Sequence, residues 1–511
     1  MPTAAADADV LVVGGGINGA GIARDLAGRG LAVLLVEQHD LASHTSSAST
    51  KLIHGGLRYL EHYEFALVRK ALAEREVLLR AAPHIIRPLR FVMPHDPSMR
   101  PVWMIRAGLF LYDHLARREL LPGSRTVRLA QHPAGAPLQS RYTMGFVYSD
   151  AWVDDARLVV LNAVDAAARG ATVLTRCRCA QVRRDGDGWV ARLQGDGSAP
   201  RNVRARALVN AAGPWAARFL HEALGIGRAK TLRLVKGSHI VVRKLFDHDH
   251  AYIFQNADKR IIFLIPYEGD FTLVGTTDVE YDGEPGAARI DDAEIDYLCE
   301  QASRYLARPV TRKAIVWAYS GVRPLLDDES GDPSAVTRDY SIELSDDSPP
   351  LLSVWGGKIT TYRKLAEEAA DRLCRALGAA HSRAWTEKTP LPGGDFSGWF
   401  APTGRPDADI ARFREELARR APQLDAATCA RWARTYGSLA RRIVDANGDL
   451  GREVAPGLHE AELRYLRDHE WARSADDVLW RRTKLGLHLD AGQRAAVQAW
   501  WSASTASPGT R

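Results

Sequence analysis

The sequence predicts an α/β protein in which a parallel-sheet domain is interleaved with an antiparallel-sheet domain and followed by a C-terminal α-helical domain. Three observations predict this fold class. A strand, a glycine turn, a helix and a second strand occupy the first 37 residues, and strand-like segments recur through the middle of the chain. From about residue 390 the composition changes to long stretches rich in Ala, Arg, Leu and Glu, which favour helices.

Length and composition limit the class of protein. At 511 residues the chain exceeds what one core usually supports, and roughly 150 residues per domain predict several domains. The five cysteines include no Cys-x-x-Cys pair, so we expect a reduced, cytoplasmic protein without a metal site. The N-terminus lacks the basic segment of a secretory signal, and no run of about 18 apolar residues predicts a membrane-spanning helix. The net charge of +6 permits nucleic acid, anionic lipid or an anionic substrate as a partner.

The first unit begins with an apolar run at residues 10–13, typical of a buried parallel strand, which ends at three consecutive glycines. A helix is predicted at 17–29 and a second buried strand at 31–37. Together these segments form a βαβ unit.

The turn of this unit has the pattern Gly-x-Gly-x-x-Gly, formed by Gly14, Gly16 and Gly19. The first glycine permits a tight turn, the second lets a pyrophosphate approach the backbone, and the third lets the helix pack on the strand. Glu37 ends the second strand, where a carboxylate can accept from ribose hydroxyls and disfavours the 2′-phosphate of NADP. The unit therefore predicts a Rossmann-type dinucleotide-binding domain.

The middle of the chain predicts antiparallel sheet. Residues 171–184 and 189–193 alternate as strands do on either side of a Gly-Asp-Gly turn, and residues 232–242 and 260–275 are also rich in strand formers. Beyond the predicted boundary near residue 390, helices are expected to about residue 501.

Two later segments favour FAD over NAD. Residues 208–215 form an apolar strand that runs into a small-residue turn, and residues 353–364 form a strand, a glycine pair and a helix start. Here the chain resembles FAD oxidoreductases of the D-amino-acid-oxidase-like superfamily. A helix N-terminus beside the flavin would stabilise the negative charge that reduction places on the ring.

Further motifs narrow the resemblance. The chain is similar to the FAD-dependent, quinone-linked sn-glycerol-3-phosphate dehydrogenases from about residue 8 to residue 490. The motifs that carry this similarity are TSSASTKLIHGGLRYLE (45–61), KGSHI (236–240), GTTD (275–278), YSGVRP (319–324), TRDY (337–340) and GGKITTYR (356–363).

The resemblance implies a division of the chain. FAD is expected to bind mainly to residues 8–75, 150–220 and 350–375, and the substrate or cap domain to occupy mainly 76–149 and 221–349, within 1–390. Residues 391–511 are expected to form the helical domain.

The resemblance also implies which residues hold FAD. The hydroxyl-rich loop that ends at Thr50 is expected to hold the pyrophosphate, and a glycine pair is expected to lie against the isoalloxazine ring. The expected cofactor-binding residues are Gly14, Gly15, Gly16, Asn18, Gly19, Glu37, Thr45, Ser46, Ser47, Ser49, Lys51, His54, Gly55, Gly56, Ala212, Gly213, Trp215, Gly357, Lys358, Ile359 and Thr360.

The expected reaction is oxidation of sn-glycerol 3-phosphate to dihydroxyacetone phosphate. Arg58, Tyr59 and Arg338 are expected to bind the substrate, because guanidinium groups make paired, charge-assisted hydrogen bonds to phosphate. His239, Arg323 and Lys358 are the expected catalytic residues. His239 is the best candidate for the base that takes the hydroxyl proton, although an orienting role stays open.

The resemblance implies that electrons pass to ubiquinone or menaquinone at the inner face of the cytoplasmic membrane, and it implies a homodimer. Residues 101–118 carry apolar side chains with arginines toward the ends, which is typical either of an interfacial helix or of an amphipathic core helix. A flavin-dependent amine or amino-acid oxidase is the alternative enzyme. A nucleic-acid-binding flavoprotein is less favoured, because no basic stripe with interleaved aromatic residues is present.

Overall fold

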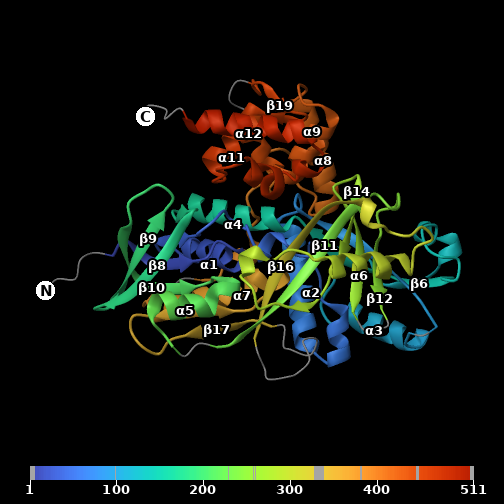
Figure 1. The fold of residues 1–511 in the computed structure, drawn as a ribbon, viewed down its shortest axis with the longest axis horizontal. Coiled ribbons are helices and arrows are strands. Elements are labelled where there is room, and N and C mark those ends of the chain that lie inside the picture. Colours follow the sequence, from blue (N-terminus) through green and yellow to red (C-terminus); the bar gives the residue numbers. More distant parts are fainter. Residues whose placement is uncertain are drawn as a thin grey trace.

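The structure, a computed structural model, describes residues 6–97, 99–227, 230–256, 258, 260–326, 339–379, 383–444 and 448–506. The chain forms two sheet-containing layers side by side, with a helical domain above them (Figure 1). Among the described residues no helix is both long enough and apolar enough to cross a membrane.

The first sheet is mainly parallel and has eight strands. Its main path is β17-β18-β10-β1-β2-β7, with β8 and β9 continuing from β10 as an antiparallel extension. β1 pairs in parallel with both β2 and β10, so segments nearly 200 residues apart lie side by side. The strands are β1 (Ala8–Val13), β2 (Val33–Val36), β7 (Thr172–Leu174), β8 (Cys177–Asp185), β9 (Gly188–Gly195), β10 (Arg201–Asn210), β17 (Ser341–Leu344) and β18 (Leu351–Trp355).

Both faces of this sheet are covered. Val10 and Val12 of β1 pack into a core with α1 (Ile17–Gly28), α4 (Asp155–Ala168) and α7 (Tyr362–Ala376). Leu11 and Val13 face the opposite core, which contains β8, β9 and α5 (Ala216–Leu224). Burial on both faces explains why the strand reads as a continuous apolar run.

The second sheet is mainly antiparallel and has ten strands. Its main path is β15-β11-β14-β13-β12-β4-β6-β3, with β16 paired to β11 and β5 paired to β6. The strands are β3 (Leu52–Ile53), β4 (Ile86–Pro94), β5 (Arg125–Arg128), β6 (Met144–Val153), β11 (Leu232–Arg243), β12 (Ala251–Gln255), β13 (Ile261–Tyr267), β14 (Phe271–Gly275), β15 (Val279–Glu280) and β16 (Ile315–Leu326).

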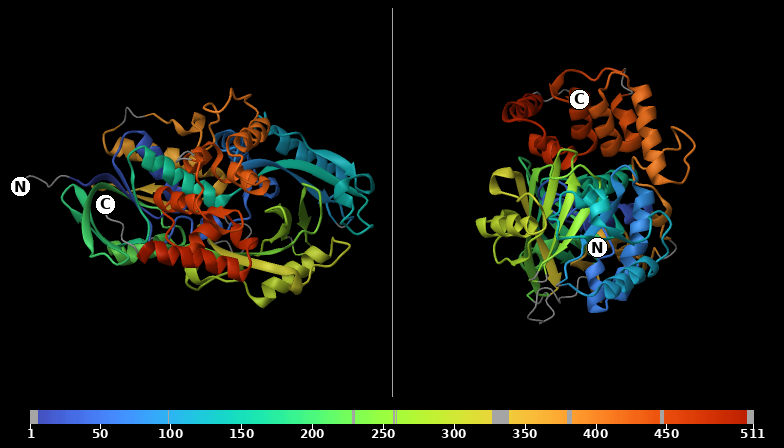
Figure 2. Two further views of the ribbon diagram at one scale, coloured as in Figure 1. Left: turned by 90° about the horizontal axis from the view of Figure 1, so that it is seen from above. Right: turned by 90° about the vertical axis from the view of Figure 1, so that its right-hand side faces the viewer.

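Helices lie on both faces of the second sheet as well (Figure 2). α6 (Asp292–Ser303) packs on one face, and α2 (Phe65–Ala81) and α3 (Val102–His114) pack on the other. The second face is the one that meets the first sheet's loops.

The C-terminal region is helical and sits on α4 (Figure 1). Its elements are α8 (Pro406–Arg420), α9 (Ala426–Tyr436), α10 (Arg441–Val444), α11 (Glu460–His469), a π-helix (Asp477–Arg482), α12 (Ala491–Ala506) and the two-stranded β19 (Glu453–Ala455) and β20 (Leu458–His459).

Buried ion pairs join this region to the first sheet. Asp40, in the loop after β2, accepts hydrogen bonds from Arg482 at 2.7 and 2.9 Å and from Arg481 at 2.6 Å. Burial opposes ionisation of Asp40, but the two guanidinium groups hold its pKa below the ordinary value. Arg157 of α4 donates to Glu470, and both side chains are fully buried.

The predicted elements at 10–13, 17–29 and 31–37 are confirmed as β1, α1 and β2, and the predicted middle strands are confirmed as β7 to β9, β11, β13 and β14. The last helix continues to Ala506, beyond the predicted end near residue 501. The domain limits themselves stay a prediction.

We expect Glu470→Gln to lower the free energy of unfolding by about 3–5 kcal/mol, because it leaves buried guanidinium groups without their carboxylate. Urea denaturation monitored by circular dichroism measures this change. Glu415→Gln removes an exposed carboxylate of the same region and should change the free energy of unfolding by less than about 0.5 kcal/mol. Equal stability of the two variants would contradict the role of the buried pair.

Candidate active site

The glycine turn of β1–α1 is built for close approach of a ligand to the backbone. Gly14 has φ +113°, a conformation that favours glycine, and a Cβ there would overlap Ala211 O. A Cβ at Gly19 would overlap Gly14 O, so this glycine lets α1 pack on the turn. Ser46 Oγ accepts from Ile17 N at 3.0 Å, which places this loop hydroxyl at the N-terminus of α1.

The carboxylate of Glu37 forms a hydrogen bond with the same turn. It accepts from Gly15 N at 2.6 Å and from His39 N at 2.8 Å. Burial raises the pKa of Glu37 even though these backbone donors favour the ionised form. Each carboxylate oxygen keeps a further lone pair for a ribose hydroxyl.

A cavity of about 700 Å³ extends from Glu37 along the glycine turn to Gly356 and Gly357. Its other wall is the turn after β10, which ends in the 3₁₀ segment Gly213–Trp215. Of the expected cofactor-binding residues, this cavity is lined by Gly14, Gly16, Asn18, Glu37, Thr45, Ser46, Ala212, Gly213, Trp215 and Gly357.

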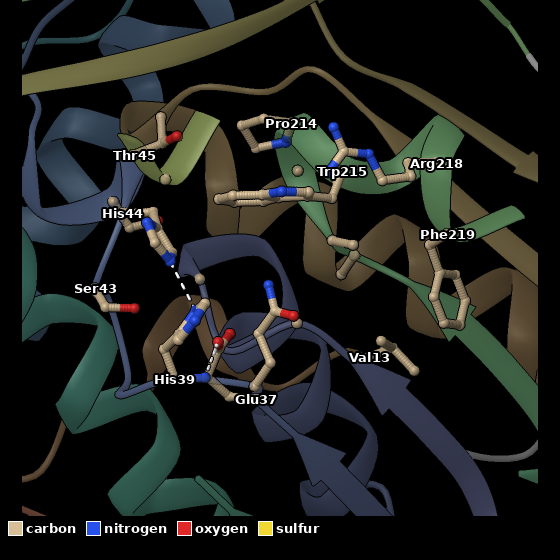
Figure 3. A pocket seen from close by; sticks show the side chains of 18 of the residues that line it. Val13, Glu37, His39, Ser43, His44, Thr45, Pro214, Trp215, Arg218 and Phe219 are labelled. Carbon is tan, nitrogen blue, oxygen red and sulfur yellow. Dashed lines mark hydrogen bonds between the residues drawn. The ribbon is translucent and has the colours of Figure 1, made fainter. Parts of the chain in front are cut away.

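Other polar residues line this cavity that were not predicted from the sequence, among them His39, His44, Arg218 and Glu284. His44 meets the Trp215 ring edge-on with centroids 4.7 Å apart and bonds to His39 at 2.9 Å (Figure 3). Glu284, from the loop after β15, accepts from Trp215 Nε1 at 2.6 Å and pairs with Arg218 at 2.5 Å. His39, His44 and Glu284 come from irregular segments and Arg218 from α5, and none of them belongs to a motif that could have indicated it.

The cavity fits a dinucleotide. Asn18 Nδ2 donates to Gly356 O at 3.1 Å, while Asn18 Oδ1 is buried without a partner in the described part of the chain. Gly356 and Gly357 have φ +69° and +100°, so the second glycine turn also exposes backbone toward the cavity. A helix N-terminus, two glycine turns and an orphaned buried amide oxygen suit a phosphate-bearing ligand with a polar ring.

The expected ring-binding segments lie together. His54 N donates to Thr360 Oγ1 at 3.2 Å, which joins β3 to the 3₁₀ segment Ile359–Thr361. Gly55 N donates to Tyr112 OH at 2.9 Å.

Tyr59 and Lys358 lie beside this junction. Gly56 has φ +75°, and a Cβ there would overlap the Tyr59 ring. Lys358 Nζ lies 3.8 Å from the centre of that ring. Arg58 and Tyr59 both belong to the 3₁₀ segment Leu57–His62, in which Arg58 is half-buried.

Two of the expected cofactor-binding side chains point elsewhere. Lys51 Nζ lies 2.8 and 2.9 Å from the carboxylate oxygens of Asp155, and both side chains are fully buried. Ser49 Oγ donates to the same carboxylate at 2.7 Å. The structure does not bring these two side chains to the cavity, because a buried ammonium needs its counter-ion.

The neighbouring loop hydroxyls join the loop to other backbone. Thr45 Oγ1 donates to Val322 O on β16 at 2.7 Å, and Ser47 Oγ donates to His44 O at 3.2 Å. The loop is therefore fixed against the second sheet.

Arg323 lies on the face of the second sheet that meets this loop. Its Nη2 donates to Thr276 Oγ1 at 3.0 Å, and it pairs with Asp278. A Cβ at Gly237 would overlap the guanidinium, so the missing side chain makes room for it. The Arg323 side chain is 33% exposed and can therefore meet a ligand. Arg338 lies outside the described residues.

His239 is on β11 beside Arg323's strand, but it is only 1% exposed. Its ring stacks on Tyr319 with centroids 4.8 Å apart, and its Nε2 lies 3.0 Å from Thr50 Oγ1. Burial, and then the charges of Arg323 and Lys51, hold the pKa of His239 well below its ordinary value. The imidazole is thus neutral near pH 7.

The site thus combines a cavity that fits a dinucleotide with a partly exposed guanidinium and a buried, neutral imidazole. The family model for FAD dependent oxidoreductases matches residues 9–363, and the C-terminal domain of alpha-glycerophosphate oxidase matches residues 384–501. The chain belongs to the FAD dependent oxidoreductase family, and its cofactor is FAD. The expected Rossmann-type FAD-binding fold with an antiparallel-sheet region and a C-terminal helical domain is confirmed.

A glycerol-3-phosphate dehydrogenase of Pseudomonas aeruginosa is 54% identical, over 96% of this chain and 94% of the relative. A D-erythritol 1-phosphate dehydrogenase of Brucella abortus is 50% identical, over 96% and 97%. The structure of the glycerol-3-phosphate dehydrogenase from Bacillus halodurans complexed with FAD superposes with a TM-score of 0.77 at 29% identity, covering 98% of this chain and 91% of that one.

We expect Gly19→Ala to purify with little or no FAD, because the added methyl group would displace the turn that is expected to receive the pyrophosphate. The ratio of flavin absorbance to protein absorbance measures FAD content. Gly108→Ala is the matched control, since nothing lies within 4 Å of a Cβ at that position. Full FAD content in Gly19→Ala would contradict the role of the turn.

Proposed function

We propose that this protein oxidises sn-glycerol 3-phosphate to dihydroxyacetone phosphate and passes the electrons to a membrane quinone, ubiquinone or menaquinone. The enzyme would work at the cytoplasmic face of the membrane as a peripheral protein. The observation that carries the proposal is the placement of an accessible guanidinium, Arg323, beside a buried neutral imidazole, His239, on one face of the second sheet.

The cations suit a phosphate. Arg323 offers a planar set of donors at the sheet, and Arg58 and Lys358 lie on or beside the two 3₁₀ segments that carry family motifs. A carboxylate clamp for an amino acid would need fewer cations and an apolar side-chain pocket, so the amine-oxidase alternative fits less well. Arg338 keeps its proposed role as a further phosphate ligand.

The chemistry divides between cofactor and protein. Bound FAD supplies the acceptor for the hydride that leaves C2 of the alcohol. Arg323 and Lys358 hold the anionic end of the substrate and orient C2, and the imidazole of His239 provides the destination for the hydroxyl proton. Because His239 is neutral before the reaction, it has a lone pair to receive that proton.

A surface beside the site suits a membrane. α3 presents Trp103, Phe110 and Leu111 to solvent, with 69%, 61% and 37% of their surface exposed, while Leu109 and Tyr112 face the core. A core helix would bury these large side chains, so the amphipathic-core interpretation of residues 101–118 fits less well.

The arginines of this segment contribute less than the sequence indicated. Arg118 pairs with Asp113 at 2.6 Å and Arg117 with Glu119 at 2.9 Å. The exposed apolar side chains of α3 are therefore the stronger argument for contact with lipid.

The same surface continues toward the ring-binding segment. Tyr63 and Phe65, directly after the segment that carries Arg58 and Tyr59, are 79% and 39% exposed. Arg100, next to α3, pairs with Glu61 at 3.7 Å. A lipid-soluble quinone at this surface would lie next to the segment that is expected to hold the flavin ring.

We expect sn-glycerol 3-phosphate to bleach the visible flavin absorption of the purified protein when oxygen is excluded. The bleaching shows that the cofactor accepts the hydride of this substrate. D-erythritol 1-phosphate, glycine and glycerol are added in parallel. Reduction by the erythritol ester alone would reassign the substrate to a longer polyol phosphate, and reduction by the amino acid alone would favour the oxidase alternative.

We expect the triple substitution Trp103→Ser, Phe110→Ser and Leu111→Ser to weaken binding to phosphatidylglycerol-containing vesicles by more than about tenfold, because it removes the apolar area available to the lipid. Co-sedimentation measures the partition coefficient. Val316→Ser, which removes an exposed apolar side chain of β16, is the control. Unchanged co-sedimentation of the triple variant would exclude α3 as the contact.

A further inference from the structure

The buried imidazole of His239 has one hydrogen-bond partner among the described residues. Its Nδ1 is buried and has no hydrogen-bond partner in the described part of the chain. Its Nε2 lies 3.0 Å from Thr50 Oγ1. Gly275 lies against the Cδ2–Nε2 edge of the ring, and Tyr319 stacks on its face. Among the described residues, Thr50 is therefore the hydrogen-bond partner through which the ring can exchange a proton, at Nε2.

Thr50 is placed to reach a substrate that His239 cannot reach. Thr50 is half-buried, whereas His239 is 1% exposed. Within the described residues the hydroxyl of Thr50 makes no hydrogen bond other than the one to His239. This hydroxyl therefore has a free lone pair for a ligand.

The residues on either side hold Thr50 rigidly. Ser49 N and Oγ both donate to Asp155, and Ser49 O accepts from Tyr319 OH at 2.8 Å. Lys51 has φ +60° and is anchored by its ion pair to the same carboxylate. Fixed neighbours reduce the reorganisation that a transfer through Thr50 would require.

The substrate's anionic end would bind close by. Gly275 contacts the His239 ring, and the next residue, Thr276, bonds to Arg323. An alcohol whose phosphate is held by Arg323 would thus lie near the Thr50–His239 pair.

We propose that Thr50 is a catalytic residue that relays the proton of the substrate's C2 hydroxyl to His239. The inference rests on the proposed function and deepens it. In the resting pair, Thr50 donates its hydroxyl proton to the lone pair of His239 Nε2, and Nδ1 carries the ring proton.

The relay balances in atoms and electrons. The C2 hydroxyl O–H bond breaks, and its proton bonds to Thr50 Oγ1. At the same time the original Thr50 O–H bond breaks, and that proton bonds to His239 Nε2. The C2 hydride leaves to FAD, the C2–O bond becomes a carbonyl, and the products are a ketone, an imidazolium and the two-electron-reduced cofactor.

Direct contact between His239 and the substrate would need a different geometry. The ring would have to leave both its stack on Tyr319 and its hydrogen bond to Thr50. The ring would then lose its one hydrogen bond among the described residues, because Nδ1, on the other side of the ring, has no partner there.

The test is single-turnover reduction of the holoenzyme by sn-glycerol 3-phosphate without oxygen. We expect Thr50→Val to slow flavin reduction at saturating substrate by about 100-fold or more, because the relay hydroxyl is lost while the side-chain shape remains. Thr50→Ser, which restores a hydroxyl, should stay within about tenfold of the native rate. Thr143→Val, at an exposed threonine, is the matched control.

The solvent isotope effect separates a relay from a structural role. With two protons moving together, the rate in mixtures of H₂O and D₂O should depend on the D₂O fraction along a curve, and the curvature should vanish in Thr50→Val. A native reduction rate in Thr50→Val, or equal impairment of the Val and Ser variants, would overturn the relay while leaving the proposed function intact.

A second measurement does not depend on turnover. In ¹⁵N-histidine-labelled holoenzyme we expect Nε2 of His239 to be unprotonated and Nδ1 protonated, with the Nε2 resonance shifted in Thr50→Val. The His239→Gln variant assigns the signals. Protonated Nε2 in the neutral ring would overturn the relay. Failure of sn-glycerol 3-phosphate to reduce the native enzyme would instead refute the proposed function, and this measurement would still test the resting pair.

Discussion

The buried ion pair between Lys51 and Asp155 is the interaction on which the site depends. Both side chains are fully buried, and Asp155 also accepts from Ser49 N and Oγ and from Ala156 N in the first turn of α4. A carboxylate in that position is favoured by the helix dipole. Burial lowers the pKa of Lys51, and the carboxylate of Asp155 opposes that effect. One carboxylate thereby fixes the loop that separates the two sheets.

The loop that Asp155 holds in place contacts both sheets. Toward the first sheet, Ser46 caps the N-terminus of α1. Toward the second, Thr45 bonds to β16, Ala48 packs on Gly321, and Thr50 reaches His239. Truncating one partner of a buried pair leaves an uncompensated charge. The dinucleotide cavity and the face of the second sheet that carries Arg323 and His239 consequently share one support rather than forming separately.

The sequence predicted local features well because their causes are local. Gly14, Gly19 and Glu37 lie where their motif requires, and the apolar run of β1 fits a strand buried on both faces. Sequence could not predict that β1 would pair with β10, because strand patterns carry no information about partners. Lys51 and Ser49 belong to a hydroxyl-rich motif, yet a carboxylate over 100 residues away binds their side chains. The contact of Asp40 with Arg482, 442 residues apart, has no periodic signature at all.

The cations beside His239 lower its pKa in the absence of substrate. Arg323 and Lys51 add to burial in disfavouring the imidazolium, so the ring remains neutral. Both cations have a carboxylate partner, Asp155 for Lys51 and Asp278 for Arg323, but only the Arg323 pair is partly exposed and could also meet an anionic ligand. An anion that binds Arg323 offsets its positive charge, which makes protonation of His239 less unfavourable. Under the proposed function, the phosphate that gives the substrate its affinity would therefore also raise the basicity of the group that receives its proton.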